Sequence, residues 1–559
     1  MSAHDEQVER GSPVHGVLSG RQSRRALLGR SLALGVAGAG IVPRSLAAQP
    51  SPVAGEGGEL ILSLGEPDSL LSGAISSATG GNIMRFIANG LAKLDQPSME
   101  AVPDLAASWQ VSDDGLTYTF TLREGVLWQD GQPFTVEDVL FSFGLWAHPE
   151  WPGPLDRNTA SIEGATAYKE GQAESISGIT AVDATTVRFV LTEPAATFLA
   201  NVATQQLLPR HLLEGVPPAD AALDPFAQKP IYTGPFMVEE WRSGDGITFR
   251  AFPECFAGPP RLDAIITRTI PDPATQIADL QSGGLHLAFV AADQYDAFAA
   301  AFQTQEIAGT AGWFFRFDLT NPLFSDPRVR QAISHAVDRA TIIETIFRGR
   351  AEANHSIASP LSWVYNPNIP RFEYDVERAN ALLDEAGWLA GPDGIRTKDG
   401  QEFSFALIAY PRTRDWAIAV QPFLEAVGIR YEVNELEFAT WIAQQVVGDY
   451  QATIGGWFNF IIDPRGDLQA HFESPRPVDA TGYINEEVNA LFQQARVALD
   501  REEEKALYDQ IQMIAESEPV HAYLWRLQDL LVVGRDFVVP EVQTQSELYA
   551  RAPEWGVRA

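Results

Sequence analysis

The chain has 559 residues, of which 45% are hydrophobic and 20% are charged, and it contains 13 Trp and 30 Phe. This composition supports a large buried core in two or three domains and argues against disorder over most of the length. The formal net charge of −33 repels nucleic acid and anionic lipid head groups, so neither is expected as a partner. The single cysteine, Cys255, excludes an intrachain disulfide and a cysteine-rich metal site.

The N-terminus has the features of an export signal. A pair of arginines, Arg24 and Arg25, precedes a short apolar stretch over residues 31–42, and small residues follow it. The stretch is too short to span a bilayer comfortably, and paired arginines in front of it are typical of the Tat route. We therefore predict a Tat-type signal peptide over residues 1–47 and a Pro/Gly-rich linker over residues 48–58.

Residues 101–143 predict a strand, a turn and a helix in succession. Apolar and polar side chains alternate over residues 116–122, which is the period of a half-buried strand. Asp113-Asp114-Gly115 supplies a tight turn before this strand, because glycine tolerates positive φ. Thr135 is placed to cap the helix, and two acidic residues follow in its first turn, where free N–H groups and the helix dipole favour negative charge.

The rest of the chain alternates between strand patterns and amphipathic helix patterns, which indicates an α/β protein. Asp326 followed by Pro327 is typical of a helix start, and Gly283 is typical of a helix end. Further helices are expected over residues 81–94, 194–208, 275–282, 327–337, 376–386 and 501–518. Further strands are expected over residues 59–64, 179–182, 186–191, 238–241, 261–270, 313–318, 403–408, 429–433, 452–455, 523–525 and 530–533.

The sequence carries no motif with the spacing of a catalytic or metal site. A Gly-x-Ser-x-Gly elbow, a His-Glu-x-x-His pair and a Walker lysine loop are all absent from it. The histidines that follow the predicted signal are scattered singly, so we expect no metal ion and no cofactor. Acidic residues are numerous enough to supply the carboxylate pair of a hydrolase, but no spacing singles out such a pair.

Three separated stretches match sequence patterns of one protein family. Residues 128–139 match the pattern Trp-x-Asp-Gly-x-Pro-Phe-Thr-x-Glu-Asp-Val, and residues 325–333 and the helix capped by Asp375 give a second and a third match. The sequence resembles the family 5 solute-binding proteins of ABC importers, which include dipeptide, oligopeptide and nickel receptors. It departs from them at Tyr232, where family members usually carry a glycine.

This resemblance implies an α/β, two-lobed periplasmic-binding-protein fold of the class II type. Lobe I would comprise residues 59–309 and 524–559, with an extra inserted subdomain at about 96–229, and lobe II would comprise residues 310–523. Family members capture a small solute between two closing lobes and deliver it to a membrane permease. We therefore expect a monomeric, exported receptor that is periplasmic or associated with the cell envelope, and not an enzyme.

The nature of the solute stays open at this point. A peptide-like solute is the first expectation, and an oligosaccharide or metal-chelate receptor of the same fold is the alternative. An exported hydrolase is the alternative from another class of protein. A hydrolase would cleave its ligand, whereas a receptor returns the ligand intact.

The resemblance also places the ligand site. In peptide-binding members, a Gly-Trp-x-x-Asp-x-x-Asp-Pro stretch sets its first Asp against the α-ammonium group of the ligand. Here the stretch is residues 456–464, and the anchoring position is Phe460, while Asp463 keeps the second acid. A buried ammonium without a carboxylate partner is unfavourable, so we expect little dependence on the α-ammonium group unless a shifted alignment makes Asp463 the anchor. The aromatic side chains would suit stacking on a sugar face, an apolar side chain or a chelate.

Two arginines complete the expected site. Arg412 and Arg414 follow the strand over residues 403–408 on an expected loop, from which either could meet a ligand carboxylate. The expected ligand-binding residues are Trp457, Phe458, Asn459, Phe460, Asp463, Arg412, Arg414, Tyr232 and Trp363.

Overall fold

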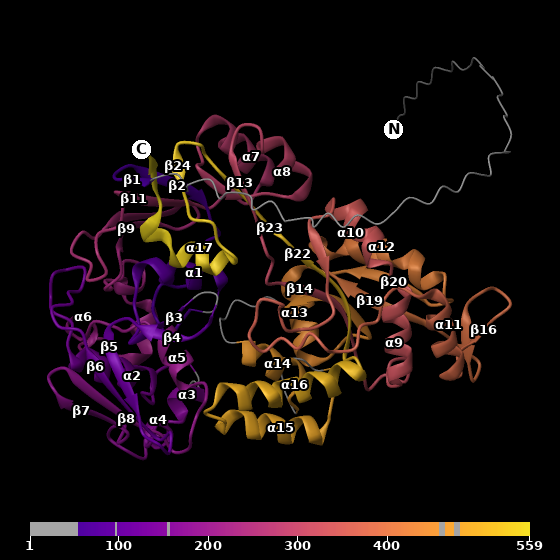
Figure 1. Cartoon of the computed structure of the whole chain (residues 1–559), viewed down its shortest axis with the longest axis horizontal. Coiled ribbons are helices and arrows are strands. Elements are labelled where there is room, and N and C mark those ends of the chain that lie inside the picture. Colours follow the sequence, from indigo (N-terminus) through magenta and orange to yellow (C-terminus); the bar gives the residue numbers. More distant parts are fainter. Residues whose placement is uncertain (1–53, 76, 96–97, 154–156, 458–463, 475–480) are drawn as a thin grey trace, which may run out of the picture. The chain divides into compact units, whose positions relative to one another are not determined.

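The computed structural model describes residues 54–75, 77–95, 98–153, 157–457, 464–474 and 481–559 (Figure 1). The predicted signal peptide over residues 1–47 lies outside the described residues. From residue 54 on, the chain belongs to one compact unit. Within the described part of the chain, no helix is both long enough and apolar enough to cross a membrane.

A seven-stranded mixed sheet forms the centre of the first lobe. Its strands are β2 (Glu59–Ser63), β9 (Phe236–Arg242), β10 (Gly246–Ala251), β11 (Ala264–Arg268), β12 (Leu287–Phe289), β13 (Gln303–Ile307) and β23 (Asp529–Val533). Their order is β13-β23-β12-β2-β11-β10-β9, and β2 runs parallel to both of its neighbours. The strand predicted over residues 59–64 is β2, in which Leu60 and Leu62 are buried.

Four helices and a short terminal sheet accompany this sheet. Helices α1 (Ala78–Ile87), α7 (Pro273–Ser282) and α8 (Ala292–Phe298) contact it, and α17 (Gln545–Ala550) contacts α1. Strands β1 (Ala54–Gly55), β24 (Phe537–Val538) and β25 (Gly556–Arg558) form a three-stranded sheet, so the predicted linker ends in a paired strand. Gly283 ends α7 in the left-handed conformation, as predicted.

An inserted antiparallel sheet carries the predicted strand–turn–helix unit. Its order is β5-β6-β8-β7, with β5 (Ala106–Val111), β6 (Thr117–Leu122), β7 (Ile179–Asp183) and β8 (Thr186–Val190), and α2 (Val136–Trp146) packs on it. Gly115 turns the chain with φ of 69°, and the Asp138 carboxylate accepts the Thr135 backbone N–H at 2.8 Å. Phe120 and Phe189 of this sheet belong to the same hydrophobic cluster as Leu60, so the insertion shares the core of the first lobe.

The first lobe also contains several short elements. They are β3 (Ala92–Leu94), β4 (Ala101–Pro103), α3 (Arg157–Ala160), α4 (Ala165–Lys169), α5 (Phe198–Thr204), α6 (Arg210–Leu213) and the 3₁₀ helices η1 (Pro218–Leu223), η2 (Pro225–Ala227) and η3 (Ala552–Glu554).

A six-stranded sheet forms the centre of the second lobe. Its strands are β14 (Gly312–Phe317), β15 (Ala351–Ala353), β19 (Ser404–Ala409), β20 (Arg430–Glu435), β21 (Ala452–Trp457) and β22 (His521–Leu527), in the order β15-β22-β14-β21-β19-β20. A small sheet, β16 (Leu389–Ala390), β17 (Arg396–Lys398) and β18 (Gln401–Glu402), follows α11 (Val376–Glu385) in the chain. The other helices are α9 (Pro327–Ala336), α10 (Arg339–Phe347), α12 (Pro411–Glu425), α13 (Phe438–Val447), α14 (Pro464–Phe472), α15 (Glu486–Val497) and α16 (Arg501–Ser517).

The chain crosses between the two lobes twice, through neighbouring segments. Residues 308–311 lead from β13 in the first sheet to β14 in the second, and Gln528 alone separates β22 from β23 on the return. The buried Arg526 ties the crossing, because its guanidinium donates to the carbonyl of Thr310 at 2.8 Å and to that of Ser356 at 2.8 Å. Among the described residues, no hydrophobic cluster joins the two sheets.

Two predicted helices are longer than the observed ones. The helix predicted over residues 81–94 ends at Ile87, because the carbonyls of Gly90 and Leu91 accept hydrogen bonds from the Leu105 and Ala106 backbone N–H groups. The helix predicted over residues 194–208 is interrupted in the same way: α5 ends before residue 205, and α6 begins only after Pro209. The apolar spacing identified the buried face in the first case, but it does not reveal pairing with a distant segment. The predicted lobe limits stay a prediction, although the limit between residues 523 and 524 falls inside β22.

The closest backbone approach in the crossing gives a test of its packing. A Cβ atom added to Gly309 would lie 1.4 Å from the Leu527 carbonyl oxygen, so we expect Gly309→Ala to lower the free energy of unfolding by at least ~1–3 kcal/mol. Gly144, inside α2, has no heavy atom within 4 Å of the same added atom, and Gly144→Ala is expected to be neutral or to stabilise by about 1 kcal/mol. Urea denaturation midpoints measure both effects, and equal midpoints for the two variants would contradict the close approach.

Candidate functional site

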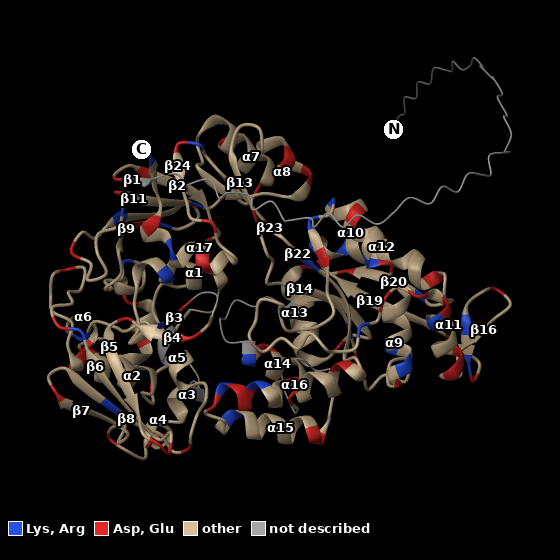
Figure 2. Ribbon diagram, in the orientation of Figure 1, with Lys and Arg blue, Asp and Glu red and all other residues tan. Residues whose placement is uncertain are grey.

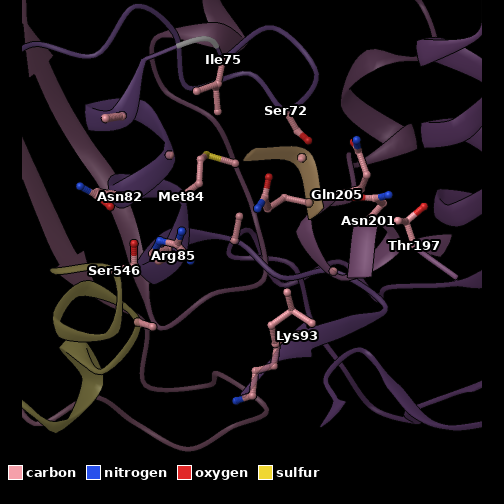
Figure 3. A pocket seen from close by; sticks show the side chains of 18 of the residues that line it. Ser72, Ile75, Asn82, Met84, Arg85, Lys93, Thr197, Asn201, Gln205 and Ser546 are labelled. Atoms are coloured by element: carbon pink, nitrogen blue, oxygen red, sulfur yellow. The ribbon is translucent and has the colours of Figure 1, made fainter. Parts of the chain in front are cut away.

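A large cavity is lined by both lobes and by both crossing segments. Its volume is about 1760 Å³. The first lobe contributes α1, Trp146, Trp151 and the segment around α5, and the crossing contributes residues 309–311 together with Leu527 and Asp529. The second lobe contributes side chains from β14, α12, α14 and α15. Figure 3 shows polar side chains of the first lobe facing this space, among them Asn82, Asn201 and Gln205.

The charges that line the cavity are nearly balanced, in contrast to the strongly acidic chain. Acidic residues are scattered over both lobes (Figure 2), and they give the chain its net charge of −33. The cavity is instead lined by six basic residues and five acidic residues. The basic residues are Arg85, Lys93, Arg261, Arg412, Arg465 and Arg496, and the acidic residues are Asp104, Glu193, Asp467, Asp529 and Glu554.

Arg412 of the second lobe and Asp529 of the first lobe both line the cavity, and their charges interact. The Arg412 guanidinium lies over the rings of Trp313 and Trp416, 5.3 and 5.9 Å from their centroids, which is the distance of a cation–π contact. Asp529 is the first residue of β23. Burial raises the pKa of the Asp529 carboxyl to about 6, while the positive charge of Arg412 acts in the opposite direction.

A few polar contacts bridge the two lobes at the rim of the cavity. The buried Arg465 donates to the Ala196 carbonyl at 3.1 Å and pairs with Glu504 at 3.1 Å. Arg501 donates to the Ser98 carbonyl at 2.7 Å and pairs with Glu100 at 3.0 Å. The Arg501–Glu100 pair is exposed, and such pairs contribute only ~0–1 kcal/mol, so the two crossing segments provide the principal connection.

Of the expected site residues, Arg412 lines the cavity. Trp457 ends β21, where its backbone pairs with that of Gly312, and the adjacent Gly456 lines the cavity. The other expected residues of that stretch lie outside the described residues, namely Phe458, Asn459, Phe460 and Asp463, so their role in binding stays a prediction.

Three expected site residues are placed apart from the cavity lining. Arg414 pairs with Asp415 and Glu435 on the surface. Trp363 packs against the core of the second lobe. The Arg501 guanidinium lies over the Trp363 ring, 4.7 Å from the ring centroid. Tyr232 is fully buried.

Tyr232 supports the cavity wall from behind. Its hydroxyl donates to the Leu70 carbonyl at 2.9 Å and accepts the Ser72 backbone N–H at 3.0 Å, and Ser72 lines the cavity. Burial raises the pKa of Tyr232, so the hydroxyl stays protonated and able to donate. The large side chain that replaces the usual family glycine therefore fixes the wall through hydrogen bonds.

The two expected arginines lie on a helix and not on a loop. Pro411 is the first residue of α12, so Arg412 and Arg414 occupy its first turn. A proline at the first position of a helix loses no hydrogen bond and has the right φ, and here it starts a helix where the sequence was interpreted as a loop. Because the helix turns between them, the two side chains have different environments.

Sequence reasoning did not identify the lining residues of α1 and of the segment around α5. These include Asn82, Arg85, Asn201 and Gln205. One signal was available for Arg85, since it is the one charged residue in the sequence of α1.

Two α/β lobes, joined by paired crossing segments and lining one cavity together, define a two-lobed solute-binding protein. The family model described as "Bacterial extracellular solute-binding proteins, family 5 Middle" matches residues 100–477. The chain belongs to this family.

Relatives within the family differ in the solutes that their names record. The oligopeptide-binding protein AppA of Bacillus subtilis is 30% identical over 83% of this chain and 85% of its own length, and its structure with a nonapeptide superposes with a TM-score of 0.73 over 90% of this chain and 100% of that one, at 27% identity. The dipeptide-binding protein of Escherichia coli is 28% identical over 76% of this chain and 81% of its own length. NikZ of Campylobacter jejuni, in complex with Ni(L-His), has a TM-score of 0.75 at 25% identity, covering 89% of this chain and 99% of that one.

Replacing Arg412 tests the electrostatics of the site. Because the charge of Arg412 lowers the pKa of Asp529, we expect Arg412→Leu to raise that pKa above about 6. Arg414→Leu is the matched control, since Arg414 pairs with Asp415 and Glu435, and it is expected to leave the pKa unchanged. The carboxyl ¹³C resonance of Asp529, followed in an acid titration, measures both values. An unchanged pKa in the Arg412 variant would show that the two groups are not coupled.

Proposed function

We propose that the protein is the extracytoplasmic receptor of an ABC importer and that it captures an oligopeptide between its lobes. The size of the cavity carries this proposal. Pockets for drug-sized ligands have volumes of about 300–1,000 Å³, whereas this cavity measures about 1760 Å³. A small chelate would leave most of that volume to water, while an extended peptide would fill it.

The composition of the lining supports a peptide as well. Neutral amide and hydroxyl side chains such as Asn82, Asn201 and Thr197 can exchange hydrogen bonds with peptide N–H and C=O groups. Trp146 and Trp151 can pack against side chains. Apolar walls with a few directed polar groups are typical of ligand sites. AppA, whose structure contains a nonapeptide, resembles this chain over most of its length.

We infer that the cavity binds peptides with little dependence on their α-ammonium group. Four of the five lining acids lie near basic groups of the protein itself: Asp529 near Arg412, Glu554 near Arg551, Asp104 near Lys93 and Asp467 near Arg526. A carboxylate that a protein cation already stabilises is a weaker partner for a ligand cation. This agrees with the family's anchoring position being Phe460 in this chain.

The proposal includes an export route and a mode of closure. Residues 1–47 act as a Tat-type signal, and the lobe built on the seven-stranded sheet moves relative to the lobe built on the six-stranded sheet about the two crossing segments, as hinged lobes do. The exported protein is a monomer, delivers the solute unchanged to the permease and catalyses no reaction on it. A cavity that both lobes line can be closed off from water by such a movement.

A calorimetric ligand panel tests the function. We expect alanine oligopeptides to bind with measurable heat, N-acetylation to weaken binding only slightly, and mass spectrometry to recover the bound peptide intact. Cello-oligosaccharides and nickel–histidine serve as comparison ligands for the other receptor classes.

Three results would contradict the proposal. Hydrolysed peptide after incubation would identify an enzyme. Tighter binding of a comparison ligand than of any peptide would identify another receptor class. Loss of binding on N-acetylation would show that an ammonium anchor exists after all.

A further inference from the structure

Among the residues that the structure describes, one basic side chain on the wall of the first lobe lacks a partner. Arg85 lies in the last turn of α1 and lines the cavity. Its side chain is partly exposed to the cavity, while its Nε atom is buried and has no hydrogen-bond partner in the described part of the chain. Figure 3 shows Arg85 among the lining side chains, near Asn82 and Ser546 in this view.

The described residues around Arg85 offer no counter-charge. Burial lowers the pKa of Arg85 to about 10 with no acidic group acting against it, and within the described part of the chain Arg85 forms no ion pair. The neighbouring lining residues Asn82 and Ser546 are neutral. A cation withdrawn from water without a partner is unfavourable by several kcal/mol, so this arrangement is costly in the empty protein.

A ligand anion would remove that cost. A guanidinium group presents a rigid fork of N–H donors that matches the two oxygens of a carboxylate, and such charged hydrogen bonds are stronger than neutral ones. Peptide bonds are neutral and the α-ammonium group has the same sign of charge as Arg85, so the carboxylate is the group of a peptide that gains most from Arg85.

We propose that Arg85 binds a carboxylate of the solute, so that the protein selects peptides with a free carboxyl group. This inference rests on the proposed function and names a feature of its ligand. The carboxylate has two sources in a peptide, the C-terminus and an acidic side chain, and the same guanidinium can bind either. A structural role is the rival explanation, because a cation in the last turn also stabilises a helix through its dipole.

Three variants separate binding from structure. Arg85→Met removes the guanidinium, Arg85→Lys keeps the charge without the fork, and Lys229→Met removes an exposed cation of the first lobe that is not among the residues lining the cavity. The probes are tetra-alanine, tetra-alanine amide, an amidated peptide whose one carboxylate is a glutamate side chain, and citrate as a carboxylate that is not a peptide. Calorimetry gives affinities, and thermal denaturation gives the stability of the empty protein.

We expect the wild-type protein to prefer a carboxylate-bearing peptide over tetra-alanine amide by about 10- to 100-fold. Arg85→Met should abolish this preference, Arg85→Lys should retain part of it, and Lys229→Met should leave it unchanged. Tetra-alanine and the glutamate peptide identify which carboxylate is bound. Because Arg85 has no counter-charge among the described residues, Arg85→Met should also raise the denaturation temperature without ligand.

The outcomes distinguish this inference from the proposed function. Peptides that bind equally well as acids and as amides would overturn the role of Arg85 and leave the function standing. A preference for acids that persists in Arg85→Met would also overturn it. If no peptide binds, the proposed function fails, and the role of Arg85 then stands only if citrate stabilises the wild-type protein and not Arg85→Met.

Discussion

The paired crossing of the chain is the constraint on which the rest of the structure depends. β13 and β23 are neighbours in the first sheet, and β14 and β22 are neighbours in the second, so both passages between lobes lie together. Gly309 allows one passage to approach the Leu527 carbonyl of the other, and Arg526 ties them through the Thr310 carbonyl. Each lobe therefore has its own core, and the space between the cores is available to a solute.

The cavity differs in charge from the surface that surrounds it. An acidic exterior keeps the chain soluble, whereas the nearly balanced cavity wall places most of its acids close to protein cations. The basic residue Arg85 differs from these paired charges, because it faces the cavity without a counter-charge among the described residues. In the proposed function, affinity for a solute comes from neutral hydrogen-bonding groups, aromatic surface and the guanidinium of Arg85.

Local signals predicted much of the fold, while the site depends on contacts that are distant in sequence. The turn at Gly115, the Thr135–Asp138 cap and the Asp326-Pro327 helix start act within a few residues, so the sequence alone shows them. The end of α1 at Ile87 depends on pairing with residues 105 and 106, and the position of Arg85 on the cavity wall depends on assembly of the whole lobe. Tyr232 also shows that the sequence does not reveal distant contacts. We expected it among the ligand-binding residues, and its hydroxyl forms hydrogen bonds with the backbone of Leu70 and Ser72.

Small-angle X-ray scattering with and without a saturating oligopeptide tests most directly whether two separately cored lobes close on a solute. Lobes that turn about two short crossing segments move as rigid bodies, so the radius of gyration is expected to fall when the peptide binds while the secondary structure content stays constant. A radius of gyration that is unchanged at full saturation would contradict closure and would show that the lobes keep their positions when the peptide binds.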